Sequence, residues 1–258
     1  MRIASLSPNL SELIFALGKG SSLVGRSSVC DFPDSVRKVP VVGKFGVPQI
    51  EKIIMVKPDY LVVTALKDRS MATRFRRFGI KVLFFNSASF CDYYNNVKVL
   101  GNILNCRKKA ELLISRTKKQ LKKIKLQLNA ISLKERPKVF VAVQVSPLMT
   151  VGRSSFINNM ITYAGGINIG AVKRVSYYRC SLEWLLKEQP DIILMSGCSD
   201  CLVSQLMNKK GWKNLMAFKN KKVNNRMKPE LLFRLGPRSV EGIEALYQIF
   251  YEKEKVRQ

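Results

Sequence analysis

The apolar and polar positions along this chain follow two periods, one typical of strands and one typical of helices. Short apolar runs predict buried strands at RIASL, YLVVT, KVLFF and KVFVAV. Between the first two, apolar residues fall on one helical face at Leu10, Leu13, Ile14 and Leu17. Ser7 before Pro8 predicts the start of this helix, and Gly18 suits its end. Strands that alternate with helices indicate βαβ units and a mostly parallel sheet.

A longer helical pattern occupies the middle of the chain. Residues 107–133 contain neither glycine nor proline, and an apolar stripe runs through Leu121, Ile124, Leu128 and Ile131. The lysines of the basic run at 116–126 take most of the other positions, so this run is interpreted as the wet side of an amphipathic helix. Such a helix would be roughly 40 Å long at 1.5 Å per residue.

Two stretches on either side of that helix repeat one pattern. Residues 50–65 and 182–197 both read apolar, Glu, then Pro-Asp seven residues after the glutamate, then an apolar strand. Equal internal spacing favours duplication of an ancestral lobe. The chain is therefore divided into an N-terminal α/β lobe (1–106), a linking helix (107–133) and a C-terminal α/β lobe (134–258). In the second lobe we expect loops at QVSPLMTVGRSS and RMKPELLFRLGPR and helices at FINNMITYAGG and SVEGIEALYQIFYEKEK.

Composition narrows the class of protein. The 258 residues are 47% apolar, as in globular proteins, and no apolar run approaches the ~18 residues of a membrane span. The formal charge of +27 suggests nucleic-acid binding, but the basic residues are scattered and no recognised nucleic-acid motif accompanies them. A solvated lysine-rich surface is the preferred reading, and its field would attract anionic ligands or membrane surfaces. No signal peptide is visible at the start, which leaves open a cytosolic location or a sequence that begins at the mature end.

Catalytic and metal chemistry find little support. The chain has no histidine, which excludes histidine-dependent metal sites, Ser-His-Asp triads and Cys-His dyads. One Cys-x-x-Cys pair, Cys198 and Cys201, stands without a second pair, so buried or free thiols are preferred to a metal or redox site. No phosphate-binding loop follows a strand. Asp59 and Asp191 of the repeat lie at the starts of strands, where a role in turn and cap geometry is favoured.

The candidate binding residues follow the carboxyl ends of the predicted strands, because ligands of open α/β sheets bind there. In the first half they are Ser7, Pro8, Asn9, Cys30, Phe32, Lys44, Phe45, Gly46, Thr64, Ala65 and Leu66. In the second half they are Pro147, Ser196, Gly197, Phe233 and Arg234. Two lobes facing each other through these loops would enclose an apolar cleft with a few polar groups, which is the usual form of a small-molecule site.

Several ordered blocks resemble the class III substrate-binding proteins of ABC importers. The blocks are RIASLSPNLSELIFALG, LVGRSSVCDFP, VPVVGKFGVPQIEKIIMVKPDYLVV, FGIKVLFF, PLMTVGRSSFINNMITYAGGINI, CSLEWLLKEQPDIILMSG, GWKNLMAFKNKKV and RLGPRSVEGIEAL, and they cover essentially the full chain. The TVG, AGG, SLE and PD series is most similar to the cobalamin-binding branch. The resemblance implies two Rossmann-like α/β lobes joined by a single long backbone helix, with the ligand cleft between the lobes.

The same resemblance implies binding and delivery and no enzyme activity. The chain would be a monomeric periplasmic binding protein that works outside the cytoplasm and needs no cofactor. It would hand cobalamin or a related corrinoid to a membrane permease dimer driven by an ATPase. One alternative keeps the fold and changes the ligand to a ferric siderophore, haem or another metal chelate, paired with Arg26, Lys44, Arg153 and Arg234. A distant alternative is a basic nucleic-acid-binding protein.

The sequence departs from the family at two kinds of position. Cobalamin-binding members tend to line the cleft with tryptophans, and the matching positions here are Phe45 and Thr64. Members also present a carboxylate on each lobe that pairs with permease arginines. In this chain the nearest carboxylates are those of Asp68 and Asp200, each displaced from the family position. The displaced carboxylates would weaken electrostatic docking or change the partner surface.

Overall fold

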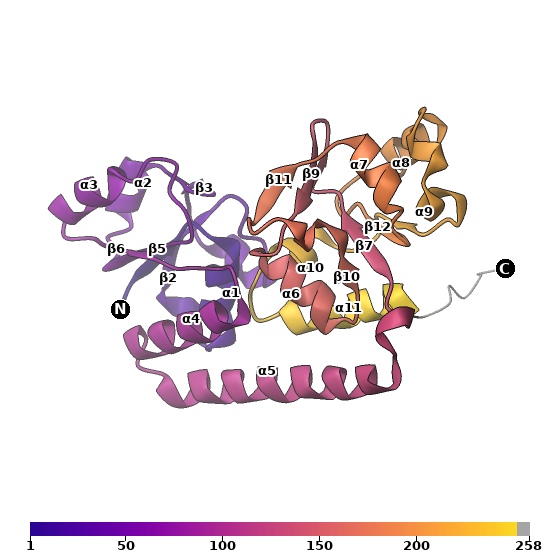
Figure 1. Ribbon diagram of the computed structural model, residues 1–258. Helices are drawn as coiled ribbons and strands as arrows, with labels where there is room; N and C mark the ends of the chain where they lie inside the picture. The colour runs from indigo at the N-terminus through magenta and orange to yellow at the C-terminus, as the bar shows by residue number, and fades with distance from the viewer. Residues whose placement is uncertain (252–258) are drawn as a thin grey trace. The chain divides into compact units, whose positions relative to one another are not determined.

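The computed structural model describes residues 1–251, which form two compact units (Figure 1). The first unit comprises Met1–Lys118 together with Arg234–Pro237, and the second comprises Lys119–Phe233 and residues 238–251. The division lies inside helix α5 (Arg107–Gln127). A four-residue segment near the end of the chain thus belongs to the unit built by its beginning.

Unit 1 is built around a six-stranded sheet in the order β4-β3-β2-β1-β5-β6. All neighbouring pairs are parallel except β3 with β4, which form an antiparallel edge. The strands are β1 (Ile3–Ser5), β2 (Leu23–Ser27), β3 (Val41–Lys44), β4 (Val47–Pro48), β5 (Tyr60–Val63) and β6 (Lys81–Phe84). The parallel order places the carboxyl ends of β1, β2, β3, β5 and β6 along one edge of the sheet.

Three helices of unit 1 lie in connections between these strands, and a fourth, α4, follows the last strand, β6. They are α1 (Pro8–Ala16), α2 (Ile50–Met55), α3 (Met71–Arg77) and α4 (Phe90–Ile103). One buried cluster joins α2 and α3 to alternate residues of the sheet through Ile53, Phe75, Ala4, Leu61 and Val63. Leu6, Val42, Leu66 and Ile80 complete this cluster. Because side chains alternate between the two faces of a strand, these residues form one face of the sheet, and α2 and α3 cover it.

Unit 2 contains two small sheets. A parallel sheet has the order β10-β7-β12-β13, and a separate antiparallel sheet has the order β11-β9-β8. The strands are β7 (Lys138–Val141), β8 (Gln144–Val145), β9 (Leu148–Val151), β10 (Ile167–Asn168), β11 (Tyr177–Arg179), β12 (Ile192–Leu194) and β13 (Val223–Asn224). The helices are α6 (Phe156–Tyr163), α7 (Leu182–Glu188), α8 (Asp200–Asn208), α9 (Met216–Lys219), α10 (Pro229–Phe233) and α11 (Ser239–Tyr251).

The sequence repeat has the same geometry in both units. Asp59 Oδ2 accepts the backbone N–H of Arg2 at 2.6 Å, and Asp191 Oδ2 accepts that of Lys138 at 2.7 Å. The residue before each proline, Lys57 or Gln189, has a positive φ of 43° or 45°. Asp59 thus fastens the turn before β5 to the start of β1, and Asp191 fastens the turn before β12 to the start of β7. This confirms the structural reading of both aspartates, at the amino ends of their sheets.

Three predictions about local structure need correction. The middle helix ends at Gln127 and is followed by a 3-10 turn over Leu128–Ala130, so the pattern expected to reach 133 stops short. The expected loop around Pro147 is a hairpin, because Ser146 and Pro147 form its two-residue turn between β8 and β9. The expected loop near Pro229 contains helix α10, since proline is well accommodated in a first helical turn.

The remaining helix predictions are close to the observed bounds. Helix α1 begins directly after Ser7, and Gly18 follows it with a φ of +69°. The final helix α11 begins at Ser239 as expected and is described to Tyr251. The last part of that prediction, residues 252–255, lies outside the described residues.

Candidate ligand-binding site

The strand-end edge of unit 1 brings several candidate residues together. Ser7 follows β1 and Thr64 follows β5, the neighbouring strand. The backbone N–H of Thr64 donates to Ser7 Oγ at 2.9 Å, and the two hydroxyl oxygens lie 3.0 Å apart. Ser7 stands at the N-cap position of α1 but makes no side-chain cap, because its hydroxyl is used across the sheet. The loops after β1 and β5 are therefore fixed to each other.

A second connection joins the loop after β3 to the loop after β5. The backbone N–H of Lys67 donates to the Gly46 carbonyl at 2.9 Å. Gly46 has a φ of +64°, and a Cβ there would lie 3.2 Å from the Ala65 carbonyl oxygen. Glycine is needed because a side chain would strain both the backbone and this close approach. Leu66 is buried beneath the loop, whereas Lys44 and Ala65 are exposed.

Two phenyl rings project from this edge of unit 1. Phe32 follows β2 and is 43% exposed, and Phe45 follows β3 and is 49% exposed. Their place in the loops after β2 and β3, more than their exposure, makes them candidates for contact with a ligand. The edge thus combines rigid hydroxyl groups with apolar faces.

Asn9 ties the segment from the end of the chain to the same edge. Its Nδ2 donates to Ser87 Oγ at 3.2 Å and to the Leu235 carbonyl at 3.1 Å. Pro8, buried beside it, occupies the first turn of α1. The side chain of Asn9, in the first turn of α1, therefore links the loop after β6 to the loop after α10.

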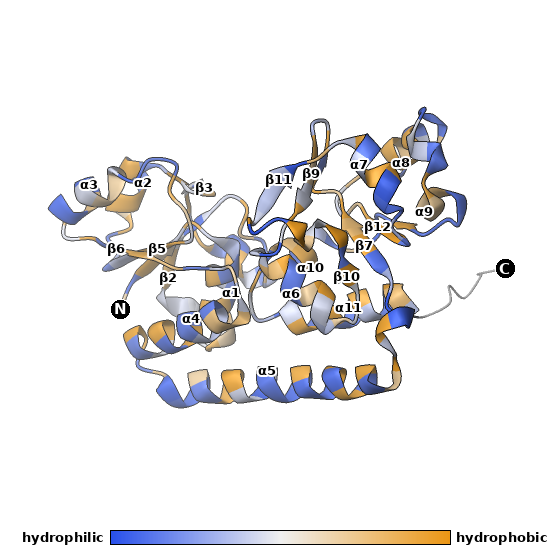
Figure 2. Ribbon diagram, viewed as in Figure 1, coloured by the Kyte–Doolittle hydropathy of each residue, from blue (hydrophilic) through white to orange (hydrophobic). Residues whose placement is uncertain are grey.

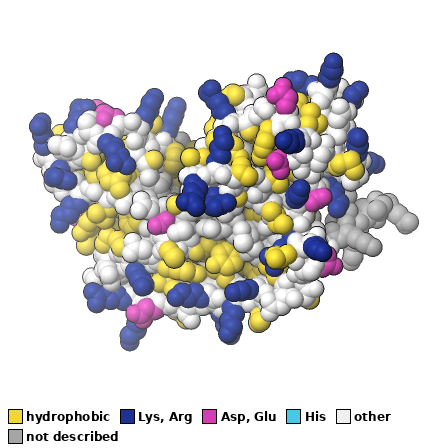
Figure 3. Space-filling view, viewed as in Figure 1, with side chains coloured by type: hydrophobic (Ala, Val, Ile, Leu, Met, Phe, Trp, Pro, Cys, Tyr) yellow, Lys and Arg dark blue, Asp and Glu magenta, His cyan; other side chains and the backbone are white. Residues whose placement is uncertain are grey.

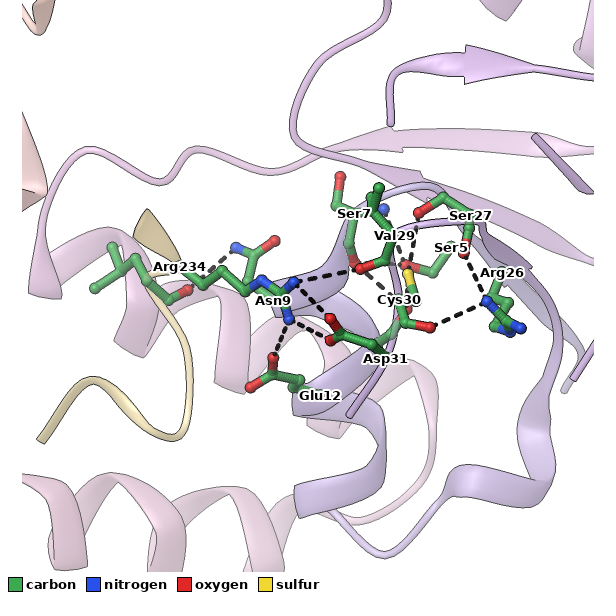
Figure 4. Close-up of polar contacts among 12 residues, drawn as sticks. Ser5, Ser7, Asn9, Glu12, Arg26, Ser27, Val29, Cys30, Asp31 and Arg234 are labelled. Atoms are coloured by element: carbon green, nitrogen blue, oxygen red, sulfur yellow. Dashed lines mark hydrogen bonds and ion pairs between the residues drawn. The ribbon is translucent and has the colours of Figure 1, made fainter. Parts of the chain in front are cut away.

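Arg234 is the centre of an ion cluster within unit 1 (Figure 4). Its Nη1 donates to Asp31 Oδ1 at 2.6 Å and to Glu12 Oε1 at 3.1 Å. Its Nη2 donates to Asp31 Oδ2 at 3.1 Å and to the Val29 carbonyl at 3.4 Å. The pairing with Asp31 is bidentate, which matches the planar guanidinium to the carboxylate. Arg234 therefore fastens the loop after β2 to helix α1.

The charged groups of this cluster are largely buried. The Glu12 side chain is only 3% exposed and that of Arg234 18%, so both charges are largely removed from water. Burial alone would lower the pKa of Arg234, but hydrogen bonds and charge from Asp31 and Glu12 outweigh it and raise the pKa above its usual value. The guanidinium therefore stays charged and lies between two carboxylates.

The loop after β2 is held from inside as well. The Cys30 thiol is buried between the hydroxyl groups of Ser11 and Ser27, at 3.2 and 3.1 Å. Arg26 donates to the carbonyls of Val39, Ser27 and Cys30 at distances between 3.0 and 3.2 Å. Both residues shape the loop that presents Phe32, and the guanidinium of Arg26 is already engaged by backbone oxygens (Figure 4).

The strand-end edge of unit 2 is tied together by a single amide. Ser196 and Gly197 follow β12, and Asn225 Nδ2 donates to the Cys198 carbonyl at 3.2 Å and to Asp200 Oδ1 at 2.7 Å. A Cβ on Gly197, whose φ is +86°, would lie 3.3 Å from Pro229 Cγ. The loop therefore packs against the start of α10, the helix that ends at Phe233.

Unit 2 also buries hydroxyl groups that have no protein partner. Ser196 Oγ and Thr150 Oγ1 are buried and accept or donate no hydrogen bond within residues 1–251. Buried polar groups are normally paired, so both are exceptions. Pro147 lies exposed at the β8–β9 turn, and no described contact joins it to Ser196.

Residues 1–251 show neither a cluster of metal-binding side chains nor a helix that could span a membrane. Within residues 1–251, no three His, Cys, Asp or Glu side chains gather as a metal site, and all six cysteines are free thiols. Burial raises the pKa of Cys180 to about 11 and raises that of Cys198 as well, which disfavours reactive thiolates. Over the same residues, no helix is both long enough and apolar enough to cross a bilayer.

The structure thus sorts the sequence-derived candidates into groups. It joins Ser7, Asn9, Gly46, Thr64 and Ala65 at one edge of unit 1, and it commits Arg234 and Cys30 to internal contacts there. Three polar residues of these edges escaped the sequence reasoning, namely Glu12, Ser87 and Asn225. Glu12 had a detectable signal as an acidic residue on the apolar side of α1, whereas Ser87 and Asn225 had none.

Comparisons with known proteins agree on one family. The sequence profile described as "Periplasmic binding protein" matches residues 3–225. An uncharacterized ABC transporter substrate-binding lipoprotein, YvrC of Bacillus subtilis, is 31% identical over 97% of this chain and 80% of its own length. The vitamin B12-binding protein of Vibrio parahaemolyticus is 23% identical over 99% of this chain and 91% of its own. A periplasmic haem-binding protein from Pseudomonas aeruginosa, 24% identical, superposes with a TM-score of 0.85 over 97% of this chain and 92% of its own.

Proposed function

Because the chain belongs to the periplasmic binding protein family of ABC transporter substrate-binding proteins, a family of non-catalytic receptors, we propose that it binds cobalamin or a related corrinoid. The expectation of a binding protein and not an enzyme follows from that membership. We propose further that the strand-end edge of unit 1 supplies part of the ligand site. The name of the Vibrio parahaemolyticus relative supports the ligand class.

The observation that carries the proposal is the pair of exposed rings beside fixed hydroxyl groups in unit 1. Phe32 and Phe45 offer apolar faces to a large flat ligand, and the Ser7–Thr64 pair lies on the same edge. A corrin ring presents an extended apolar face and a rim of neutral amides. Aromatic stacking with a few hydrogen bonds suits that chemistry.

The hydrogen bonds of Arg26 and Arg234 also favour a neutral ligand. Arg234 is paired with two carboxylates, and Arg26 donates to backbone carbonyls. Neither guanidinium is available to an anionic chelate without breaking those contacts. Cyanocobalamin carries no net charge, whereas ferric catecholates are strongly anionic. The edge of unit 1 therefore suits the former.

We propose that the chain works outside the cytoplasm and that its partner is a membrane permease dimer driven by an ATPase. The relative from Bacillus subtilis is named a substrate-binding lipoprotein of an ABC transporter, which supports this location. Asp68, the candidate docking carboxylate of unit 1, accepts the N–H and hydroxyl of Ser70, each at 2.8 Å. These bonds lower its pKa, so it remains ionised at neutral pH.

Replacement of Phe45 by alanine tests the proposal directly. Calorimetric titration of the purified protein with cyanocobalamin should show binding, and Phe45→Ala should weaken it about tenfold, since a stacked ring contributes roughly 0.5–1.5 kcal/mol beyond the apolar area that it buries. Phe78→Ala is the matched control, because Phe78 is 57% exposed but precedes β6 at the opposite edge of the same sheet. The control should leave affinity unchanged.

Two results would contradict the proposal. If cyanocobalamin shows no heat of binding at high micromolar concentration, the ligand class is wrong. If both phenylalanine variants bind as tightly as the parent, the strand-end edge of unit 1 is not the site.

A ferric siderophore or haem is the second candidate. Lys44 supports it, because the ammonium group of this exposed lysine beside Phe45 has no hydrogen-bond or ion-pair partner within residues 1–251. The structural similarity to the Pseudomonas aeruginosa haem-binding protein is compatible with it. Competition between cyanocobalamin and a ferric catecholate separates the two, and Lys44→Gln should weaken only the anionic chelate.

A further inference from the structure

Helix α5 has one buried face and one face that nothing in the described chain covers. Its buried positions are Ala110, Ile114, Thr117, Leu121 and Ile124. At 100° per residue these positions centre on one side of the helix. Figure 2 shows the resulting alternation of hydrophilic and hydrophobic residues along α5.

The exposed face is strongly basic. It presents Lys108, Lys109, Arg116, Lys119, Lys122 and Lys123, against the single acidic residue Glu111. Arg107, Lys118 and Lys125 lie at its margins, and the Lys118 ammonium lies 5.2 Å from the centre of the Tyr94 ring. Within residues 1–251, no carboxylate forms an ion pair with any of them. Figure 3 shows dark-blue side chains along the helix. The face therefore carries a dense positive charge that the protein itself does not neutralise.

Two leucines lie at the centre of this basic face. Leu112 is 61% exposed and Leu126 is 60% exposed. The helical period places both within about 40° of Lys108 and Lys119 and nearly opposite the buried positions. They are separated by roughly 21 Å along the helix. A single exposed leucine needs no explanation, but two on the axis of a lysine-rich face give that face an apolar centre.

We propose that this face of α5 docks on a bilayer that contains anionic phospholipid. Lysines flanking exposed leucines on a helix that lies flat are the arrangement by which proteins bind membrane surfaces without crossing them. Phosphate head groups complement the lysines, while the leucines enter the boundary between head groups and acyl chains. Nucleic acid would satisfy the charge but would leave the leucines in water. The choice of a bilayer also agrees with the proposed delivery to a membrane permease, although the docking does not depend on the ligand.

Co-sedimentation of the full chain with vesicles tests the inference. Mixed phosphatidylglycerol–phosphatidylcholine vesicles should bind the protein at physiological salt, and phosphatidylcholine vesicles should not. The triple variant Lys119→Gln, Lys122→Gln, Lys123→Gln should bind on the order of 100-fold more weakly, since each lysine near an anionic surface contributes about fivefold. The pair Leu112→Ser, Leu126→Ser should weaken binding about tenfold at unchanged charge.

A matched charge control separates the helix from the net charge of the protein. Lys209→Gln, Lys210→Gln, Lys213→Gln removes the same charge from exposed positions of unit 2 and should reduce binding only severalfold. Equal losses in the two triple variants would overturn the proposal. So would leucine-independent binding combined with equally tight binding of duplex DNA, which would assign the face to nucleic acid. Cyanocobalamin titration of the same variants, expected to be unchanged, keeps this outcome distinct from failure of the proposed function.

Discussion

The two units are alike at the amino ends of their parallel strands and differ at the carboxyl ends. At the amino ends, Asp59 and Asp191 accept a backbone N–H at 2.6 and 2.7 Å in the same helix-turn-strand unit. At the carboxyl ends, unit 1 pairs Ser7 with Thr64, whereas the Ser196 hydroxyl of unit 2 has no partner within the described chain. The amino edge builds the scaffold in both copies. The carboxyl edge carries no such requirement, so its side chains are free to differ.

The largest expected effect comes from the ion cluster, which has no counterpart among the described residues of unit 2. Arg234→Leu should lower the free energy of unfolding by about 3 kcal/mol, because the buried Glu12 carboxylate loses the charge and the hydrogen bond of Arg234. Urea unfolding followed by circular dichroism measures the loss.

Two variants check that assignment. Arg37→Leu breaks an exposed pair with Asp34 at 3.9 Å and should leave the free energy of unfolding nearly unchanged. Adding Glu12→Leu to Arg234→Leu should recover part of the loss, as a double-mutant cycle requires for coupled charges. A fully additive cycle would show that Glu12 and Arg234 do not interact.

The repeated aspartates give an intermediate effect that tests the shared edge. Asp59→Ala and Asp191→Ala should each lower the free energy of unfolding by about 1 kcal/mol, since each removes one charge-assisted bond to a backbone N–H. Asn at either position keeps an acceptor and should cost less. If one alanine variant is costly and the other is neutral, the two copies do not share a structural role.

Elements with a clear apolar period were predictable from the sequence. Helix α1 begins after Ser7 and the repeat places β5 and β12, because spacing alone specifies these features. Helix α4 was missed although Ser89 and Asp92 form a capping box at its start, because its aromatic and polar residues blur the period. The β8–β9 hairpin was missed because Pro147 was read as a loop signal.

The candidate site was predictable only to the level of loops. Strand ends identified Ser7, Thr64 and Phe45 because topology fixes which edge they occupy. Arg234 was assigned to an anionic ligand, yet its partner Asp31 lies 203 positions away in the sequence. No local pattern can reveal a contact at that separation. The partnerless hydroxyl of Ser196 was equally invisible, because pairing is decided by neighbours that only the folded chain supplies.

That partnerless hydroxyl gives the smallest expected effect and the sharpest contrast. Ser7→Ala should lower the free energy of unfolding by about 1 kcal/mol, because the Thr64 N–H loses its acceptor at 2.9 Å. Ser196→Ala should change it by less than about 0.5 kcal/mol or raise it, because an unpaired buried hydroxyl costs desolvation and returns nothing. Urea unfolding of both variants under one condition makes the comparison. A loss at Ser196 equal to that at Ser7 would mean that its oxygen is paired in solution, and the two carboxyl edges would then be alike.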